Sequence, residues 1–491
     1  MLASMMSTST TSEGVPNRWR DPGTPIRLSF GPRTPIVATR SSFRSPHRVY
    51  GESPGGAISS PASGSRRQLS SPRTAREVGM FAEGLRCVGC RLETDLGGHF
   101  FGCRDCGGAL ETVYDEDRVS AAVSFGDWQD RADRSLWRYR ELLPVRDQSA
   151  VITLGEGRTP LVHLPPSQAN PIADLWIQNE TMNPTYSFKD RFHSVAQSMA
   201  RQLGYRRVAC STTGNHGMSA AAYAARGGLR CVILVDPRAP EVQRRWMRLF
   251  GATVIVEMDR RPPLVSFVRD HGWYPSTYMT PTPVATPYGM EGYKTMAYDA
   301  VLALGRVPDH YIVPIAAGDG LYGPWKAFGE MARLGWTDSI PKVHGVQPTG
   351  ANPIVRAFRD GSDTVPVIRH PETIALSIGD PTGGSMTLRA IRESGGQAID
   401  LSDPEIVAAT RYAASAGLSP EPSSAASLAG AWALARDGVI REGETVMCLF
   451  TGAGPKWPET TELLTTGDEI MSPDRAWLER LASDPESVGA S

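Results

Sequence analysis

Short apolar runs recur through the middle of the chain, and segments with helical periodicity separate them. The runs 208–211, 231–236 and 311–315 are apolar with little alternation. Strands that are apolar on both faces are typical of sheets covered by helices on both sides. Because units that alternate strand and helix form parallel sheets, we predict an α/β fold. Its core is predicted to be two doubly wound, parallel-sheet subdomains.

The overall composition excludes several classes of protein. The chain has 491 residues and a formal net charge of -1, which gives no indication of a nucleic-acid or membrane partner. No apolar run approaches the roughly 20 residues that a membrane span needs, and no apolar secretory segment stands near the start. The seven cysteines are too few for a disulfide framework. We therefore expect a cytoplasmic protein that binds neither nucleic acid nor a membrane.

Residues 1–78 are rich in Ser, Pro, Gly, Thr and Arg and are predicted to be a disordered leader. An Arg- and Ser-rich, acid-poor leader resembles an organelle transit peptide. It could equally be a tail without function, or sequence upstream of the true start. Met80 stands just before the first segment that is expected to be ordered, which favours the last interpretation.

Two C-x-x-C pairs lie in the segment 79–115, separated by twelve residues. They are formed by Cys87, Cys90, Cys103 and Cys106. Two such pairs at this separation indicate a closed, tetrahedral site for a structural zinc ion. The alternative is a relic whose cysteines no longer bind metal. We predict that this segment is a small zinc-ribbon-like unit.

The remaining chain divides by composition into three parts. Residues 116–150 carry tryptophans and charges with helical character and are expected to connect the zinc-ribbon-like unit to the main domain. The alternating strands and helices occupy 151–460, and the smaller subdomain is predicted at about 183–300. Residues 461–491 are polar and are expected to form a peripheral tail.

The segment Asn183–Arg191 places a lysine at the start of a predicted helix. Pro184 disfavours helical geometry before it, and Ser187 is expected to cap the helix. Apolar residues then follow at helical spacing. Lys189 is an unfavourable choice in the first turn, because the helix dipole is positive there. It is either an ordinary surface lysine or an amine that loses its charge by forming a Schiff base.

Three polar loops follow predicted strands, where α/β proteins bind ligands. Ser211–Gly217 offers hydroxyls and helix N-terminal amides for a carboxylate. Gly318–Leu321 offers backbone amides for a phosphate, and the carboxylate of Asp319 is expected to point away from it. Thr451 offers a hydroxyl, although a plain turn at the end of a strand would also explain it.

These motifs together resemble threonine synthase and its relatives, the fold type II pyridoxal-phosphate (PLP) enzymes of the tryptophan synthase β superfamily. The resemblance covers roughly residues 80–460. Its motifs, in chain order, are Leu154–Leu161, Asn183–Arg191, Ser211–Gly217, Pro287–Thr295, Ile374–Pro381 and Glu421–Ala426. A paired-cysteine segment also precedes the catalytic domain in many members of this family.

The resemblance implies that PLP binds between the two subdomains and assigns a role to each candidate residue. Lys189 is implied as the catalytic Schiff-base lysine. The other residues implied to contact the cofactor are Phe188, Asn215 at the ring hydroxyl, Gly318, Asp319, Gly320 and Leu321 at the phosphate, and Thr451 at the pyridine nitrogen. The residues implied to bind the substrate carboxylate are Ser211, Thr212 and Thr213. A homodimer that acts on a small amino acid is also expected.

The resemblance implies a PLP-dependent carbon–oxygen lyase that converts O-phosphohomoserine and water to threonine and phosphate. Two alternatives stay open. One is β-replacement on O-phosphoserine or serine, or ammonia release from threonine or serine. The other is a PLP- and zinc-binding interaction protein without turnover, although the presence of Lys189 argues against it.

Two aromatic residues stand where the family usually has glycine. They are Tyr186 and Phe192, and we expect them to reshape the pocket. A substrate phosphate also needs a cationic partner. The candidates for it are Arg158, Arg191, Lys294 and Lys456.

Overall fold

The computed structural model describes residues 81–279, 286–465 and 474–483. The leader predicted at 1–78 and much of the tail predicted at 461–491 lie outside the described residues. None of the helices within these ranges combines the length and the hydropathy that crossing a membrane requires.

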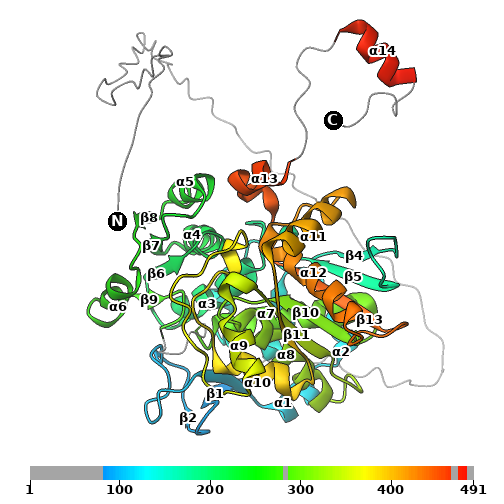
Figure 1. Cartoon of the computed structure of the whole chain (residues 1–491). Coiled ribbons are helices and arrows are strands. Elements are labelled where there is room, and N and C mark those ends of the chain that lie inside the picture. The colour runs from blue at the N-terminus through cyan, green and yellow to red at the C-terminus, as the bar shows by residue number, and fades with distance from the viewer. Residues whose placement is uncertain (1–80, 280–285, 466–473, 484–491) are drawn as a thin grey trace, which may run out of the picture. The chain divides into compact units, whose positions relative to one another are not determined.

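The larger sheet has six strands in the order β12-β11-β10-β13-β5-β4 (Figure 1). The strands are β4 (Leu161–Leu164), β5 (Asp174–Asn179), β10 (His310–Pro314), β11 (Lys342–Pro348), β12 (Ala398–Leu401) and β13 (Thr445–Phe450). All neighbours pair in parallel except the edge strand β4, which is antiparallel to β5. The sequence patterns did not predict β5 or β12.

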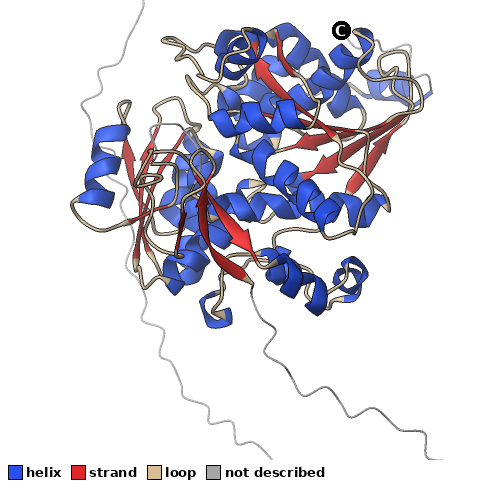
Figure 2. Ribbon diagram, turned by 90° about the horizontal axis from the view of Figure 1, so that it is seen from below, coloured by secondary structure: helices blue, strands red, loops and turns tan. Residues whose placement is uncertain are grey.

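The smaller sheet is wholly parallel and has the order β8-β7-β6-β9. Its strands are β6 (Arg207–Thr212), β7 (Arg230–Val235), β8 (Thr253–Val256) and β9 (Tyr274–Pro275). Figure 2 shows the strands of the two sheets as separate groups with helices around them. The predicted α/β class with two parallel-sheet subdomains is confirmed, apart from the antiparallel edge.

Helices pack around both sheets. The α-helices of the described residues are α1 (Glu116–Ala122), α2 (Phe125–Asp130), α3 (Lys189–Gln202), α4 (Asn215–Gly227), α5 (Glu241–Leu249), α6 (Arg261–Arg269), α7 (Gly289–Leu304), α8 (Asp319–Arg333), α9 (Pro353–Arg359), α10 (Ser385–Glu393), α11 (Asp403–Ser415), α12 (Pro422–Arg436), α13 (Pro458–Leu464) and α14 (Arg475–Ser483). Helix α3 packs against both α4 and α7. It therefore joins the two subdomains.

A three-stranded antiparallel sheet precedes the catalytic domain and docks on helices α7 and α8. Its order is β2-β1-β3, formed by β1 (Ala82–Cys87), β2 (Glu93–Thr94) and β3 (Leu110–Tyr114). The Tyr114 hydroxyl donates to Glu291 on α7 at 2.8 Å. The Tyr322 hydroxyl on α8 donates to Glu111 at 2.9 Å. These polar contacts hold the unit against the catalytic domain.

Four cysteine sulfurs meet at one end of this small sheet. The Sγ atoms of Cys87 and Cys106 are 3.4 Å apart, and those of Cys90 and Cys103 are 3.6 Å apart. All four lie within 4.8 Å of one another. Zinc–sulfur bonds of about 2.3 Å in a tetrahedron separate the sulfurs by about 3.8 Å. The cluster therefore has the donor set and the spacing of a structural zinc site.

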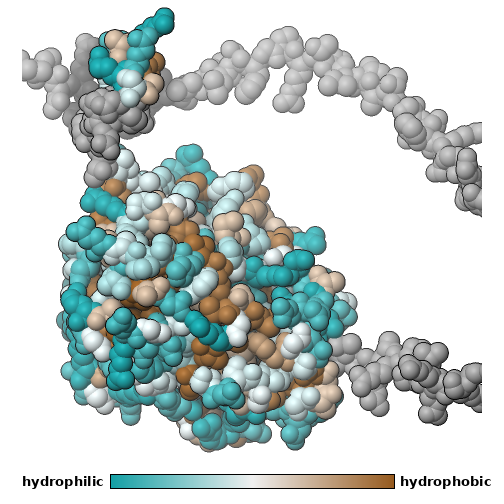
Figure 3. Space-filling model, turned by 90° about the vertical axis from the view of Figure 1, so that its right-hand side faces the viewer, coloured by the Kyte–Doolittle hydropathy of each residue, from teal (hydrophilic) through white to brown (hydrophobic). Residues whose placement is uncertain are grey.

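One face of the molecule carries a band of hydrophobic side chains between hydrophilic ones (Figure 3). Elsewhere on the same face, hydrophilic side chains dominate. Single exposed apolar residues are ordinary on protein surfaces, but contiguous ones are typical of contact surfaces.

We expect purified protein to contain zinc in a one-to-one ratio with the chain, measured by atomic emission. Replacing Cys90 and Cys106 together with serine should remove the metal and lower the melting temperature by several degrees, because the small sheet loses its cross-link. Replacing the buried Cys231 and Cys448 with serine is the matched control and should leave zinc bound. Zinc retained without Cys90 and Cys106 would contradict this site.

Candidate active site

The lysine segment makes a tight turn before helix α3. Tyr186 has a φ of 61°, in the left-handed region that favours glycine. This explains why glycine is common at this position in the family. The Tyr186 side chain itself is 55% exposed, and it does not contribute to the cavity wall among the described residues.

The helix starts differently from the prediction. Ser187 was expected to cap it, but Phe188 is the residue before α3 and the Ser187 hydroxyl has no hydrogen-bond partner. The Asp190 carboxylate instead accepts the backbone amide of Thr185 at 2.6 Å. The backbone of Ser187 pairs with that of Gly452 in an antiparallel bridge. The turn is therefore shaped by its neighbours and not by a local cap.

The end of strand β13 holds this turn in place. The Phe188 amide donates to the Thr451 carbonyl at 2.9 Å, and the Ala453 amide donates to the Tyr186 carbonyl at 3.1 Å. Together with the Ser187–Gly452 bridge, these bonds attach the lysine segment to the larger sheet. Lys189 thus begins a helix of one subdomain while its turn is fixed to the other.

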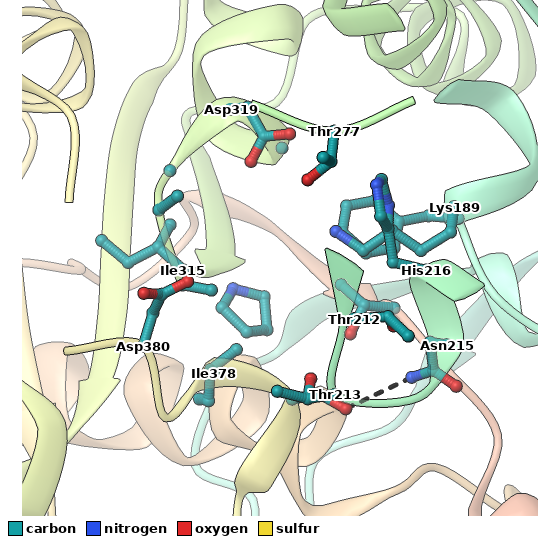
Figure 4. Close-up of a pocket in the computed structure, with 18 of the residues that line it drawn as sticks. Lys189, Thr212, Thr213, Asn215, His216, Thr277, Ile315, Asp319, Ile378 and Asp380 are labelled. Carbon is teal, nitrogen blue, oxygen red and sulfur yellow. Dashed lines mark hydrogen bonds between the residues drawn. The ribbon is translucent and has the colours of Figure 1, made fainter. Parts of the chain in front are cut away.

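A cavity of about 140 Å³ opens beside Lys189. Its wall combines the lysine, the loop after β6, the loop after β10 and the end of β13 (Figure 4). The predicted residues that line it are Phe188, Lys189, Ser211, Thr212, Thr213, Asn215, Gly318, Asp319, Gly320 and Thr451. Leu321 lies behind the wall, and its amide already donates to the Gly318 carbonyl.

The amine of Lys189 lies beside aromatic rings, and its side chain is half-buried in the cavity wall. Its Nζ lies 4.4 Å from the centre of the Phe188 ring and 5.5 Å from that of Tyr293. Burial lowers the pKa of Lys189, although the charges of Asp319 and Glu421 act in the opposite direction. No carboxylate in the described residues forms an ion pair with it. The amine is therefore easier to deprotonate than an ordinary lysine.

Two histidines form a closed hydrogen-bond circuit beside the lysine. His216 Nε2 is 2.8 Å from the Ser276 carbonyl, so this nitrogen must donate. His216 Nδ1 then accepts from His193 Nε2 at 3.2 Å, and His193 Nδ1 accepts from the Ser276 hydroxyl at 2.9 Å. Burial and the charge of Lys189 lower the pKa of His216 to about 3. Both rings are neutral at pH 7, and each ring nitrogen has a partner.

A family model identifies the family. The model of the family described as "Pyridoxal-phosphate dependent enzyme" matches residues 152–452. This span contains the lysine, both ligand loops and Thr451. The chain belongs to the PLP-dependent enzymes.

Its curated relatives include threonine synthases. The threonine synthase of Methanocaldococcus jannaschii is 36% identical over 76% of this chain and 93% of its own length. That of Methanosarcina acetivorans is 34% identical over 77% of this chain and 93% of its own. The resemblance to threonine synthases predicted from the motifs is confirmed.

Solved structures share the fold at lower identity. A threonine deaminase from Solanum lycopersicum superposes with a TM-score of 0.54 at 20% identity, over 67% of this chain and 88% of that one. A diaminopropionate ammonia lyase from Escherichia coli also gives 0.54 at 17% identity, over 66% of this chain and 95% of that one. At these identities the likeness shows the fold alone.

The loop before α8 fits the phosphate of PLP. Gly318 has a φ of 104°, and a Cβ there would lie 1.8 Å from the Thr387 hydroxyl. A Cβ on Gly320 would lie 2.6 Å from the Phe188 ring. Glycine is therefore required at both positions, and it leaves the amides of the first helical turn open to an anion. Asp319 was expected to point away, but it lines the cavity.

Buried polar atoms without partners fit the PLP ring. The Asn215 Nδ2 group donates to both Glu421 oxygens at 3.0 and 2.9 Å. Its Oδ1 has no hydrogen-bond partner, so it can accept from a ring hydroxyl. The Thr451 hydroxyl lies 3.1 Å from that of Ser424. It is thus oriented by an uncharged neighbour, as the partner of an unprotonated pyridine nitrogen would be.

The hydroxyls of the loop after β6 are not equivalent. The Thr212 hydroxyl accepts the amides of Gly214 and Gly217, both at 2.9 Å, and so shapes the turn into α4. The Ser211 hydroxyl accepts from Arg260 Nε at 3.2 Å. Thr213 lines the cavity without a hydrogen bond from its hydroxyl to any described residue.

None of the four predicted phosphate partners reaches the cavity. Lys294 pairs with Glu330 at 2.8 Å, and Arg191 pairs with Glu180 at 2.7 Å. Lys456 donates to the Thr185 carbonyl at 3.0 Å, and Arg158 is exposed outside the wall. These candidates were wrong because sequence spacing does not show which cations are already neutralised in the core.

The expectation for Phe192 was also wrong. This side chain is buried behind the cavity and packs on the rings of Tyr293 and His216. A Cβ on Gly289 would lie 2.2 Å from the Phe192 ring, so that glycine accommodates it. The aromatic residue fills a gap between α3 and α7 and does not line the pocket.

Several cavity residues were not recognised as site residues from the sequence. Arg260 and Tyr278 stand in unremarkable stretches. Asp380 and Glu421 belong to two motifs of the family resemblance, but neither residue was given a role in the site. Asp380 lies across the cavity from Lys189 (Figure 4). Burial and the charge of Asp319 raise the pKa of Asp380 to about 6.

We expect Gly318→Ala to weaken PLP binding on the order of tenfold or more, because its Cβ would displace Thr387 and the residue would be strained. The measurement is titration of the apoenzyme with PLP, followed by visible absorbance. Gly335→Ala is the control. It has a φ of 69° with open space around it, so it should cost stability without changing PLP affinity. Equal affinities for both variants would refute the proposed cradle.

The lowered pKa of Lys456 predicts that the free energy of unfolding depends on pH. Burial lowers its pKa from 10.5 to about 8. Between these values the unfolded chain holds a proton that the folded protein has released, so stability rises with pH. Relative to Lys456→Met, the wild-type free energy of unfolding should increase by about 3 kcal/mol between pH 7.5 and 10.5. Urea titrations measure it, and a difference that stays constant with pH would contradict the shift.

Proposed function

We propose that the chain is a threonine synthase-like lyase that releases phosphate from O-phosphohomoserine and adds water to give threonine. The observation that carries this proposal is the Lys189 amine, whose pKa is lowered, in a cavity that also offers a glycine cradle and an uncharged partner for a pyridine ring. The similarity to threonine synthases over 93% of their length supports the choice of substrate.

The residues divide the work as follows. PLP would be held by Lys189 and would supply the withdrawal of electrons from the α-carbon of the substrate. The amides of Gly318, Asp319 and Gly320 would bind its phosphate, and the free Oδ1 of Asn215 would accept from its ring hydroxyl. The uncharged Thr451 hydroxyl would be the partner of the pyridine nitrogen, which would favour elimination and replacement over transamination.

Other residues of the cavity would bind the substrate carboxylate and transfer protons. The N-terminus of α4, with Ser211, Thr212 and Thr213, binds the substrate carboxylate. The Lys189 amine would move protons at neighbouring carbons. Its lowered pKa favours the neutral amine. The rings of Phe188 and Tyr293, stacked 4.8 Å apart, shield the amine from water.

The small sheet contributes structure and not chemistry in this proposal. Four cysteine ligands would leave no open position on the zinc ion for a substrate. We also propose a cytoplasmic homodimer. The seven cysteines are all free, as in a reducing compartment, and the hydrophobic band of Figure 3 is a surface that a second copy would cover. Light scattering of the purified protein tests the dimer.

A substrate panel tests the reaction. The holoenzyme is incubated in parallel with O-phosphohomoserine, O-phosphoserine, threonine and serine. We expect equal amounts of phosphate and threonine from the first alone. Ammonia or a 2-oxo acid from threonine or serine would favour an ammonia-lyase instead, and phosphate from O-phosphoserine would favour a replacement enzyme.

Two lysine variants test whether Lys189 is the residue that binds PLP. Lys189→Ala should abolish turnover and the fixation of PLP to the chain by borohydride. Lys456→Met removes the other buried lysine with a lowered pKa, but outside the cavity wall, and should keep the borohydride-fixed cofactor. Fixation that survives in Lys189→Ala would refute the assignment of this lysine.

A further inference from the structure

The cavity wall holds one lysine and one arginine among the described residues. They are Lys189 and Arg260. His216 also lines the wall, but its low pKa keeps it neutral. Under the proposed function Lys189 is committed to the cofactor. An anionic group on the substrate side chain therefore has Arg260 as its cationic partner.

Arg260 is held in place from two sides. It stands immediately before α6, and its Nη1 donates to Asp236 Oδ2 at 2.6 Å. Its Nε donates to the Ser211 hydroxyl at 3.2 Å. Asp236 is only 1% exposed, so the anchor is rigid. The Nη2 group has no hydrogen-bond partner in the described part of the chain, which leaves one edge of the guanidinium for a ligand.

Three acidic residues share the cavity wall with Arg260. They are Asp319, Asp380 and Glu421, and the Glu421 carboxylate already accepts the Asn215 amide. Burial and Asp319 raise the pKa of Asp380 to about 6, and a second anion nearby would raise it further. The charges of Arg260 and Lys189 act in the opposite direction on this pKa. A phosphate bound at Arg260 would favour the protonated form of Asp380, which can donate a hydrogen bond to a phosphate oxygen.

We propose that Arg260 binds the side-chain phosphate of the substrate and so makes the enzyme prefer phosphorylated over unphosphorylated amino acids. The inference rests on the proposed function, because it takes Lys189 as the cofactor lysine. Binding of the side-chain phosphate is distinct from binding of the α-carboxylate, because every amino acid carries an α-carboxylate. Arg260 would then determine substrate specificity. The four cations predicted from the sequence to bind the phosphate lie outside the cavity wall.

Kinetics of Arg260→Gln test the assignment. We expect KM for O-phosphohomoserine to rise on the order of 10- to 100-fold, the range for losing a hydrogen bond to a charged group. Arg260→Lys should recover part of the loss, because it keeps the charge without the fork. The affinity for serine, read from the cofactor absorbance, should change little. An equal loss for serine would assign Arg260 to the α-carboxylate and overturn the proposal.

Arg238→Gln is the matched control. Arg238 also pairs with Asp236, at 3.0 Å, but it is 48% exposed and lies outside the cavity wall. It should leave KM for the phosphorylated substrate unchanged. A loss equal to that of Arg260→Gln would show that both act by disturbing Asp236, which contradicts a direct contact.

A binding experiment separates this inference from the proposed reaction. In the holoenzyme the cofactor phosphate already fills the glycine cradle, so added inorganic phosphate reports on the remaining anion site. Calorimetry should detect phosphate binding to the wild type and to Arg238→Gln, but not to Arg260→Gln. If O-phosphohomoserine is not turned over but phosphate binding shows this pattern, the proposed reaction is refuted and the anion site at Arg260 is supported. If the wild-type holoenzyme binds no phosphate, the Arg260 site is refuted.

Discussion

The buried ion pair of Arg191 is the interaction on which the site depends. Its guanidinium is fully buried and pairs with Glu180 at 2.7 Å and with Asp299 at 2.7 Å. Glu180 follows strand β5, Asp299 belongs to α7, and Arg191 lies two residues after the reactive lysine. Removing one member would leave uncompensated buried charge, which costs about 3–5 kcal/mol. The pair therefore fixes the start of α3 against both neighbouring elements.

The same network extends to the glycine-rich loop that opens the catalytic domain. The Asp299 carboxylate also accepts the Arg158 amide at 2.7 Å. The Gly157 amide donates to Asn183 at 3.0 Å, at the start of the lysine turn. These bonds explain why a loop distant in sequence accompanies the lysine motif. It supports the segment that carries Lys189 and does not itself line the cavity.

Some of the site residues that the sequence identified act through their backbone. Gly318 follows a strand and caps helix α8, and Gly320 lies in the first turn of that helix, so their amides lie at the sheet edge. Leu321 was an error of one position, since the helix already uses its amide. The fold prediction failed in a similar way at β5 and β12, where buried polar residues such as Gln178 interrupt the apolar pattern. Gln178 is satisfied by the Tyr311 hydroxyl at 2.8 Å, a partner distant in sequence.

The sequence by itself determined the α/β class, the reactive lysine candidate, the ligand loops and the cysteine cluster. Each of these features follows from the spacing of nearby residues or from an apolar run. The tertiary structure decided which cations remain available to a substrate. Arg191 and Lys294 look like Arg260 in sequence, but they are fully buried in the core with Glu180 and Glu330. Arg260 also pairs with a carboxylate, that of Asp236, but it lines the cavity. Charge pairing joins residues that are far apart along the chain, and local patterns do not encode it.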